Sequence, residues 1–157
     1  ISIWQRFLLR YRDDKRIANV HYALGRMYTF AGQSAAALGE FKLIQRRFSQ
    51  STLAPYAYLE ASKIRTIMKD YAGASTDLNE MLLQYPDCKA ADQATLYLAQ
   101  ATLESGQTAH AADLFKKVFQ MDLTLPGKID AAYGWAAVLI CRKTGRRSRN
   151  GSDGRWS

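Results

Sequence analysis

The side chains in this sequence that could hold a metal ion or act as nucleophiles are few and widely separated. The two histidines are His21 and His110, which cannot form the paired i, i+4 ligand face of a helical zinc site. Cys88 and Cys141 are too few for a disulfide framework or a cysteine-rich zinc site, and we interpret them as buried or half-buried thiols. We therefore expect neither a metal nor a cofactor.

Phosphate-binding loops and acid–base pairs are also missing from the sequence pattern. Neither GxGxxG nor GxxxxGK occurs. The Asp13-Asp14 pair precedes a predicted helix, where negative charge stabilises the helix dipole, so we do not interpret it as an acid–base couple. Catalytic triads are assembled in space and cannot be proposed from spacing alone. The sequence thus predicts a protein that is not an enzyme.

What the sequence does contain is an internal repeat of 37 residues. One register carries large apolar side chains, at Trp4, Phe41, Leu78 and Phe115. Another carries small residues, at Gly25, Ser62 and Ala99. The period needs no gap across three full copies, and a period of this size is typical of solenoid proteins.

Each copy contains two amphipathic patterns separated by a turn. In the first copy Gly32 can end one helix and Ser34 can cap the next. The second copy has Lys69-Asp70-Tyr71 at this place, without glycine, which predicts a less regular helix end. Apolar spacings of three and four predict helices at 1–11, 15–31, 34–48, 53–69, 71–85, 89–105, 108–121 and 128–143.

A helix pair of this size cannot bury its own apolar faces and must stack on its neighbours. We therefore predict an all-α fold, a right-handed α-α superhelix of antiparallel pairs with about eight helices. The predicted solenoid, 1–143, consists of a half repeat 1–14, repeats 15–51, 52–88 and 89–125, and a half repeat 126–143. Residues 144–157 follow as a disordered basic tail.

Counting from Ala18, the copies resemble the tetratricopeptide repeat. The first copy carries the family pattern at Leu24, Gly25, Tyr28, Gly32, Ala37 and Phe41. The second retains Tyr71, Ala74, Leu78 and Pro86 but has Ser62 and Arg65 where glycine and tyrosine are usual. The third retains Leu98, Ala99, Gly106, Ala111 and Phe115.

The period exceeds the usual tetratricopeptide repeat of about 34 residues. Together with the Tyr85-Pro86 junction between copies, it resembles the repeat domains of bacterial cell-envelope proteins, such as the Tol–Pal-associated coordinator and the outer-membrane assembly lipoprotein, over about residues 1–141. This resemblance implies a periplasmic or cell-envelope location.

The family binds proteins or peptides and has no catalytic residues of its own, and the first helix of each pair lines its concave surface. The resemblance therefore implies a peptide-binding groove. An extended or helical peptide with apolar anchors would suit its aromatic, aliphatic and basic side chains. Tyr22 and Arg26 stand where chaperone-binding members carry a carboxylate clamp, so we do not expect a chaperone adaptor. The groove residues are Asn19, Tyr22, Arg26, Phe30, Tyr56, Leu59, Lys63, Ile67, Gln93, Leu96, Gln100 and Leu103.

The net charge of +8 is distributed unevenly. Residues 142–157 supply +5, because they contain six basic residues and one aspartate, and residues 1–141 supply +3. Only the tail therefore suggests an alternative function, binding of nucleic acid or an anionic surface, with Trp156 able to stack. The tail could equally be a solubilising end or sequence foreign to the repeat.

Two expectations concern the ends and the surroundings of the chain. The sequence opens with Ile1, which suggests a processed product or an excised fragment, and it has no apolar run of 18 residues that would span a membrane. If the tail forms no helix, the apolar face of 128–143 lacks its usual cover, and we predict that this end self-associates or frays. That face consists of Ile129, Ala132, Trp135, Val138 and Leu139.

Overall fold

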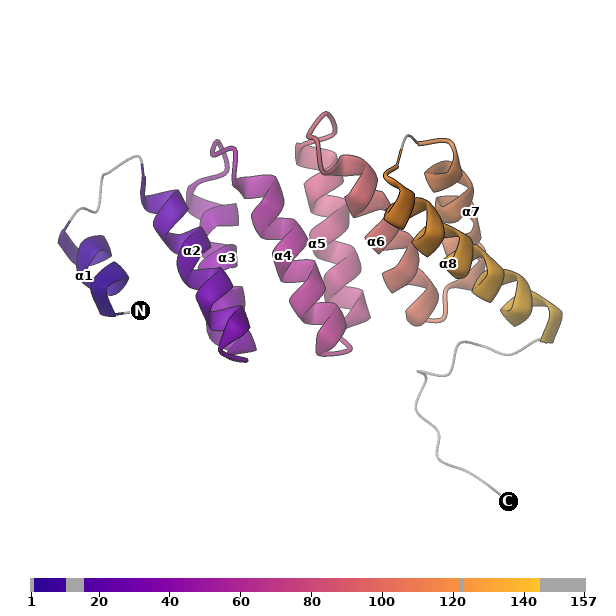
Figure 1. The fold of residues 1–157 in the computed structure, drawn as a ribbon, viewed down its shortest axis with the longest axis horizontal. Helices are drawn as coiled ribbons and strands as arrows, with labels where there is room; N and C mark the ends of the chain where they lie inside the picture. Colours follow the sequence, from indigo (N-terminus) through magenta and orange to yellow (C-terminus); the bar gives the residue numbers. More distant parts are fainter. Residues whose placement is uncertain (1, 11–15, 122, 145–157) are drawn as a thin grey trace, which may run out of the picture. The chain divides into compact units, whose positions relative to one another are not determined.

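The computed structural model describes residues 2–10, 16–121 and 123–144, which form α-helices joined by short turns (Figure 1). The described residues contain no β-strand, so the all-α prediction is confirmed. Asp13-Asp14 and residues 145–157 of the basic tail lie outside the described residues. The helices are α1 (Ser2–Arg10), α2 (Ile17–Phe30), α3 (Ser34–Arg47), α4 (Ala54–Ile67), α5 (Tyr71–Gln84), α6 (Ala91–Glu104), α7 (Thr108–Phe119) and α8 (Leu125–Thr144).

The largest difference from the predicted helix bounds is at the start of α8. This helix begins at Leu125, three residues before the predicted residue 128. Pro126 is its second residue, where a proline costs nothing because the first N–H groups of a helix have no intrahelical acceptor. Pro55 occupies the same early position in α4.

The turn that follows the first helix of each pair is the same in all three copies. Gly32, Lys69 and Gly106 lie one period apart and all have a positive φ, of 71°, 61° and 87°. The predicted irregular helix end at Lys69 is therefore wrong, because Lys69 adopts the left-handed backbone that glycine adopts in the other copies. Asp70 then starts α5, its carboxylate accepting a hydrogen bond from the Gly73 N–H at 3.0 Å.

The predicted capping role of Ser34 is also wrong. Ser34 is already the first helical residue of α3, and the residue before it, Gln33, makes no side-chain capping bond. The backbone bond from Gln33 N–H to Tyr28 C=O instead satisfies the end of α2, as expected after a left-handed glycine.

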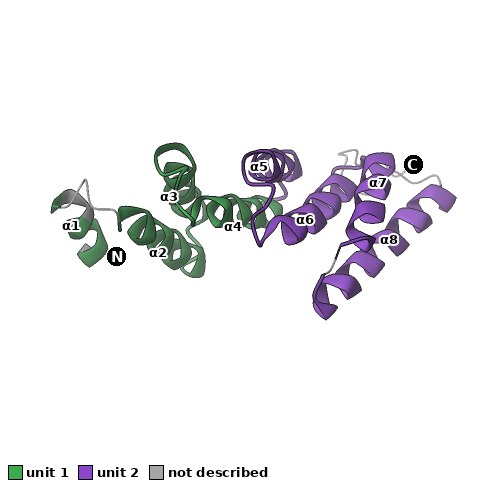
Figure 2. Cartoon of the chain, turned by 90° about the horizontal axis from the view of Figure 1, so that it is seen from above, with its two compact units in different colours: residues 1–68 green, residues 69–157 purple. Residues whose placement is uncertain are grey.

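The described helices belong to two compact units (Figure 2). In unit 1, residues 1–68, α3 packs against both α2 and α4, and α1 contacts α2. In unit 2, residues 69–157, α6 packs against α5 and α7, and α8 packs against α7 and α6. Within each unit, consecutive helices therefore pack as in a helical-repeat solenoid.

The core of unit 1 forms where an aromatic ring meets a glycine. Phe41 on α3 is fully buried, and a Cβ on Gly25 of α2 would lie 2.8 Å from its ring. Tyr22 packs its ring edge-on against Phe41, with the ring centroids 5.7 Å apart. Beside this contact, His21 Nδ1 and Glu40 Oε2 lie 2.6 Å apart and join α2 to α3. The lack of a side chain at Gly25 thus lets α2 and α3 approach each other closely.

The core of unit 2 repeats this arrangement around Phe115. Phe115 on α7 is fully buried in a cluster with Ala99 of α6 and Val138 of α8. A Cβ on Gly134 of α8 would overlap the Phe115 ring. One aromatic side chain therefore packs against the helices before and after it.

Trp4 does not share the buried surroundings of its register. Trp4 is 40% exposed, whereas Phe41, Leu78 and Phe115 are at most 1% exposed. The reason is that α2 is the only helix with substantial packing against α1 among the described residues.

Candidate binding surfaces

The twelve predicted groove residues fall on α2 and α4 in unit 1 and on α6 in unit 2. Their exposure divides them into three groups. Asn19, Arg26, Phe30, Ile67 and Gln93 are exposed; Tyr22, Tyr56, Lys63 and Gln100 are half-buried; Leu59, Leu96 and Leu103 are buried.

The three buried leucines do not belong to an exposed surface on their helices. Leu59, Leu96 and Leu103 are 3%, 2% and 7% exposed. Leu96 and Leu103 belong to the apolar cluster around Phe115, because their side of α6 turns toward α7. Leu59 and Leu103 therefore belong to the core, and Leu96 forms part of the wall of a cavity in unit 2.

In unit 1, the hydroxyl group of Tyr22 on α2 is influenced electrostatically by side chains of both α2 and α4. Burial raises the pKa of this phenol above its usual value of 10, and the negative charge of Glu60 raises it further. Arg26 lowers the pKa of Tyr22, and Tyr56 contributes a smaller upward effect. Side chains of α2 and α4 are thus close enough to interact electrostatically with the same hydroxyl group.

The same face carries two cationic side chains with different surroundings. Lys63 lies 2.9 Å from Glu60, one turn earlier on α4, so part of its charge is already neutralised. The guanidinium of Arg26 lies 5.9 Å from the centre of the Phe30 ring, in a cation–π arrangement. Glu60 was missed at the sequence level, although its i, i+3 spacing from Lys63 indicates the pair. We call the exposed and half-buried set the α2/α4 face: Asn19, Tyr22, Arg26, Phe30, Tyr56, Glu60, Lys63 and Ile67.

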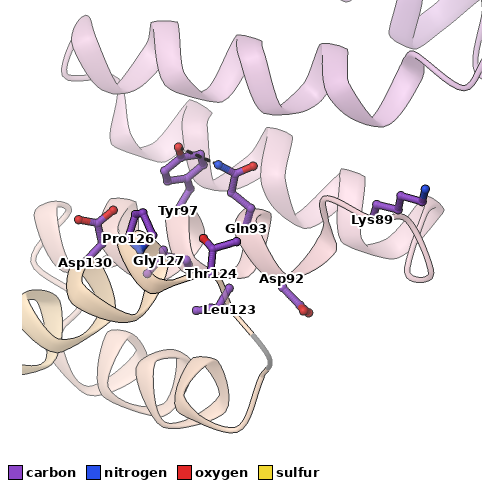
Figure 3. A pocket seen from close by; sticks show the side chains of 10 residues that line it. Lys89, Asp92, Gln93, Tyr97, Leu123, Thr124, Pro126, Gly127 and Asp130 are labelled. Atoms are coloured by element: carbon purple, nitrogen blue, oxygen red, sulfur yellow. Dashed lines mark hydrogen bonds between the residues drawn. The ribbon is translucent and has the colours of Figure 1, made fainter.

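Unit 2 has a cavity of about 410 Å³ between the start of α6 and the start of α8 (Figure 3). This volume is within the usual range for ligand-binding pockets. Gln93 and Leu96 are the two predicted groove residues that line it. The complete lining is Lys89, Asp92, Gln93, Leu96, Tyr97, Leu123, Thr124, Pro126, Gly127 and Asp130.

The cavity presents polar groups beside apolar ones. The Gln93 side-chain amide donates a hydrogen bond to the Tyr97 hydroxyl at 3.3 Å, and Figure 3 shows the two side chains facing each other. Leu96, Leu123 and Pro126 supply apolar wall. The i, i+4 spacing of Gln93 and Tyr97 was visible in the sequence, whereas nothing there indicated that residues 123–130 fold back over α6. The arrangement suits a peptide group with an adjoining small apolar side chain.

The remaining features of the described part of the chain are its metal-ligating side chains, its cysteines and the lengths of its helices. This part contains no group of three or more histidine, cysteine, aspartate or glutamate side chains placed to hold a metal ion. Cys88 and Cys141 are free and half-buried. None of the helices described here combines the length and the apolar character needed to cross a lipid bilayer.

Comparison with known proteins agrees with the helical repeat. A family model described as "Tetratricopeptide repeat-like domain" matches residues 4–124, most of the chain. The chain therefore belongs to the tetratricopeptide repeat-like family, whose members are typically non-catalytic scaffolds for protein interactions. No curated protein matches the chain significantly. This match supports the tetratricopeptide repeat-like family in general. It does not confirm the resemblance to the cell-envelope group.

Proposed function

We propose that this protein is a non-catalytic interaction scaffold that binds a segment of another protein on the α2/α4 face of unit 1. One observation carries the proposal: Tyr22, Tyr56 and Phe30 present aromatic surface beside Arg26 and Lys63 on two neighbouring first helices. Aromatic and arginine side chains dominate the binding energy of protein interfaces. The Tyr22 ring already packs against Phe41, so this part of the aromatic area loses little conformational entropy on binding.

The charges on this face favour a partner segment with both apolar and acidic groups. Phe30 and Ile67 are 83% and 76% exposed, one period apart at the ends of their helices, and each offers a site for an apolar anchor. Arg26 offers a planar donor for a carboxylate. Because Glu60 already pairs with Lys63, we expect Arg26 to contribute more than Lys63 to the recognition of acidic groups.

The cavity in unit 2 supports the same function through a separate contact. Its Gln93–Tyr97 pair and the Thr124 side chain provide hydrogen-bonding groups for a peptide backbone. Leu96 and Leu123 would then contact one small apolar side chain of that segment. A scaffold with two such contacts gains affinity when a single partner occupies both.

The test is a binding measurement with short peptides selected from a displayed library against the full chain. Titration calorimetry should show that Tyr22→Ala weakens binding by about tenfold or more, because loss of a buried aromatic contact costs about 1–2 kcal/mol or more. Lys63→Glu should also weaken binding of acidic peptides.

A matched control is Lys42→Glu, which makes the same charge change at an exposed position on α3 and should leave the affinity unchanged. If every selected peptide binds the Tyr22→Ala and Lys63→Glu variants as well as the parent chain, the α2/α4 face is not the binding surface.

A second candidate function rests on the charge distribution. Residues 142–157 carry +5 of the total charge of +8, which favours binding of nucleic acid or another polyanion by the tail. The structure describes only residues 142–144 of this segment. Single-stranded DNA binding that weakens steeply with salt and disappears on deletion of 142–157 would support it; binding that survives the deletion would exclude it.

A further inference from the structure

One side of α8 carries apolar residues that no other described helix covers. Tyr133 is 76% exposed and Ile140 is 62% exposed, near the middle and the end of the helix. Spacings of three and four place them on one side with two small residues, Ala132 and Ala136, which are also exposed. We call this the α8 outer face: Ile129, Ala132, Tyr133, Ala136, Leu139 and Ile140.

The earlier copies show what normally covers this position in unit 2. One period before Ala132 and Ala136 lie Thr95 and Ala99 of α6, which are 3% and 0% exposed. Ala99 lies in the apolar cluster with Phe115, the central aromatic residue of α7. The second helix of the pair therefore covers the side of α6 that corresponds to the α8 outer face.

Unit 1 shows the same relation between α2 and α3. The corresponding residues of α2 are His21 and Gly25, both buried. The Phe41 ring of α3 lies so close to Gly25 that a Cβ there would be 2.8 Å away. In both units a small residue on the first helix receives a large aromatic side chain from the second. Ala136 is the equivalent small residue of α8, with nothing described in front of it.

Residues 145–157 do not carry the side chains that such a helix needs. The residue one period after Phe115 is Ser152, and Trp156 is the only large apolar residue within 145–157. In a second copy, the helices that carry such side chains, α3, α5 and α7, already bury them within their own units. The required occupant is a helix like α3 or α7.

The neighbouring groups define this helix further. Arg142 and Lys143 lie in the last turn of α8. Hairpin pairs run antiparallel, so the first turn of a docked helix would lie near these cations and favour acidic residues. The apolar surface also continues onto α7, where exposed Phe119 packs edge-on against Trp135, with centroids 6.3 Å apart.

We propose that the α8 outer face binds an amphipathic helix of another protein, with acidic residues near its start and a large apolar side chain opposite Ala136. This contact is separate from the α2/α4 face and from the cavity, and it adds a third interaction surface to the scaffold. A small residue at position 136 lets the two helices approach closely, and Ile129, Tyr133 and Ile140 flank the inserted side chain.

The chain itself supplies a suitable probe. A synthetic peptide of residues 70–84 has the sequence of α5 with its capping Asp70, and carries a net charge of −3 from Asp70, Asp77 and Glu80. Its Leu78 occupies the register of Phe115. Added to the isotope-labelled full chain, this peptide should shift the amide resonances of residues 129–140. The same peptide with Leu78→Asp should not bind.

Variants of the full chain complete the test. Ile140→Asp and Ala136→Trp should each abolish peptide binding, the first by adding a charge and the second by filling the space. Ile3→Asp is the matched control, since Ile3 is an exposed isoleucine on α1 in unit 1, outside the surfaces proposed to bind partners, and it should bind the peptide normally.

Three results would overturn the proposal. The first is no resonance shift at residues 129–140 with the 70–84 peptide. The second is peptide binding that survives both Ile140→Asp and Ala136→Trp. The third is concentration-dependent dimerisation, seen in sedimentation and removed by Ile140→Asp, in a chain that does not bind the peptide; this result would make a second copy the occupant.

Discussion

The contact between Gly25 and Phe41 decides how closely α2 and α3 can pack. The Phe41 ring is fully buried, and a new methyl group at 2.8 Å from it could not be accommodated by a small rotation. Gly134 and Phe115 stand in the same relation in unit 2. Glycine at these two positions is therefore required by space, not by backbone conformation.

We predict that Gly25→Ala destabilises the protein. Overpacking a filled core costs about 1–3 kcal/mol, and the better helix propensity of alanine returns only about 1 kcal/mol. The midpoint of urea denaturation should therefore fall. The matched control is Gly39→Ala on α3, where no atom would meet the new Cβ and the midpoint should rise. A Gly25→Ala variant as stable as Gly39→Ala would contradict the packing described for α2 and α3.

Tyr22 provides a test of the electrostatics of the α2/α4 face. Burial, and then Glu60, raise its pKa above 10, so the folded state holds the phenolic proton more tightly than the unfolded state does. This contribution to stability is complete below pH about 10 and is lost as the pH rises through the pKa of the folded state. Tyr22→Phe should therefore flatten the loss of stability between pH 8 and pH 11 in denaturant titrations. An unchanged pH dependence would mean that Tyr22 is not buried beside Glu60.

At the residue scale, the sequence predicted the type of side chain at a position better than it predicted whether that side chain lies in the core or on the surface. The small residue at position 25 and the aromatic residue at position 41 follow directly from the 37-residue period. The period could not show that Leu59 and Leu103 turn into the core, because groove and core positions differ by one residue on a helix and both accept leucine. The i, i+3 spacing of Glu60 and Lys63 permits an ion pair, but spacing alone does not show that the two side chains meet.

Among the helical elements, the turn at Lys69 offers the clearest prediction. A left-handed backbone costs a residue with a Cβ about 1–2 kcal/mol, and the extra chain entropy of an unfolded glycine costs about 0.5–1 kcal/mol. Lys69→Gly should therefore stabilise the protein by about 0.5–1 kcal/mol. Thermal unfolding should show a higher midpoint.

The reverse substitution supplies the control for Lys69. Gly106→Ala places a Cβ at a φ of 87°, where no other atom is close, so only backbone strain changes. Its midpoint should fall by an amount similar to the gain at Lys69. A lower midpoint for Lys69→Gly would mean that this lysine does not adopt the left-handed conformation in solution.

The helices could be predicted because the spacing of their apolar residues and the positions of the turn residues between them indicate the same helix bounds. Helix α5 begins at Tyr71 and α7 begins at Thr108, as the turns before them indicate. Helix α8 starts earlier than predicted, at Leu125, because Pro126 fits the first turn of a helix, where its missing N–H leaves no intrahelical hydrogen bond unmade. The cavity next to it is lined by residues of this segment together with residues near the start of α6, and the spacing within one segment does not show which distant segment it meets.

At the scale of the whole molecule, the contacts proposed for partners fall on three surfaces. The α2/α4 face lies in unit 1, and the cavity and the α8 outer face lie in unit 2. Each of them combines exposed apolar area with a few polar groups, which suits protein segments. The family membership, shown by the match over residues 4–124, agrees with an interaction scaffold.

The most direct test of this account is to map where a selected peptide binds on the isotope-labelled full chain. The account predicts that the largest changes in amide resonances fall within residues 19–30 of α2 and 56–67 of α4. It also predicts that these changes disappear in the Tyr22→Ala variant and persist in Lys42→Glu. Changes confined to the outer side of α3 or to residues 142–157, with none on α2 and α4, would contradict it.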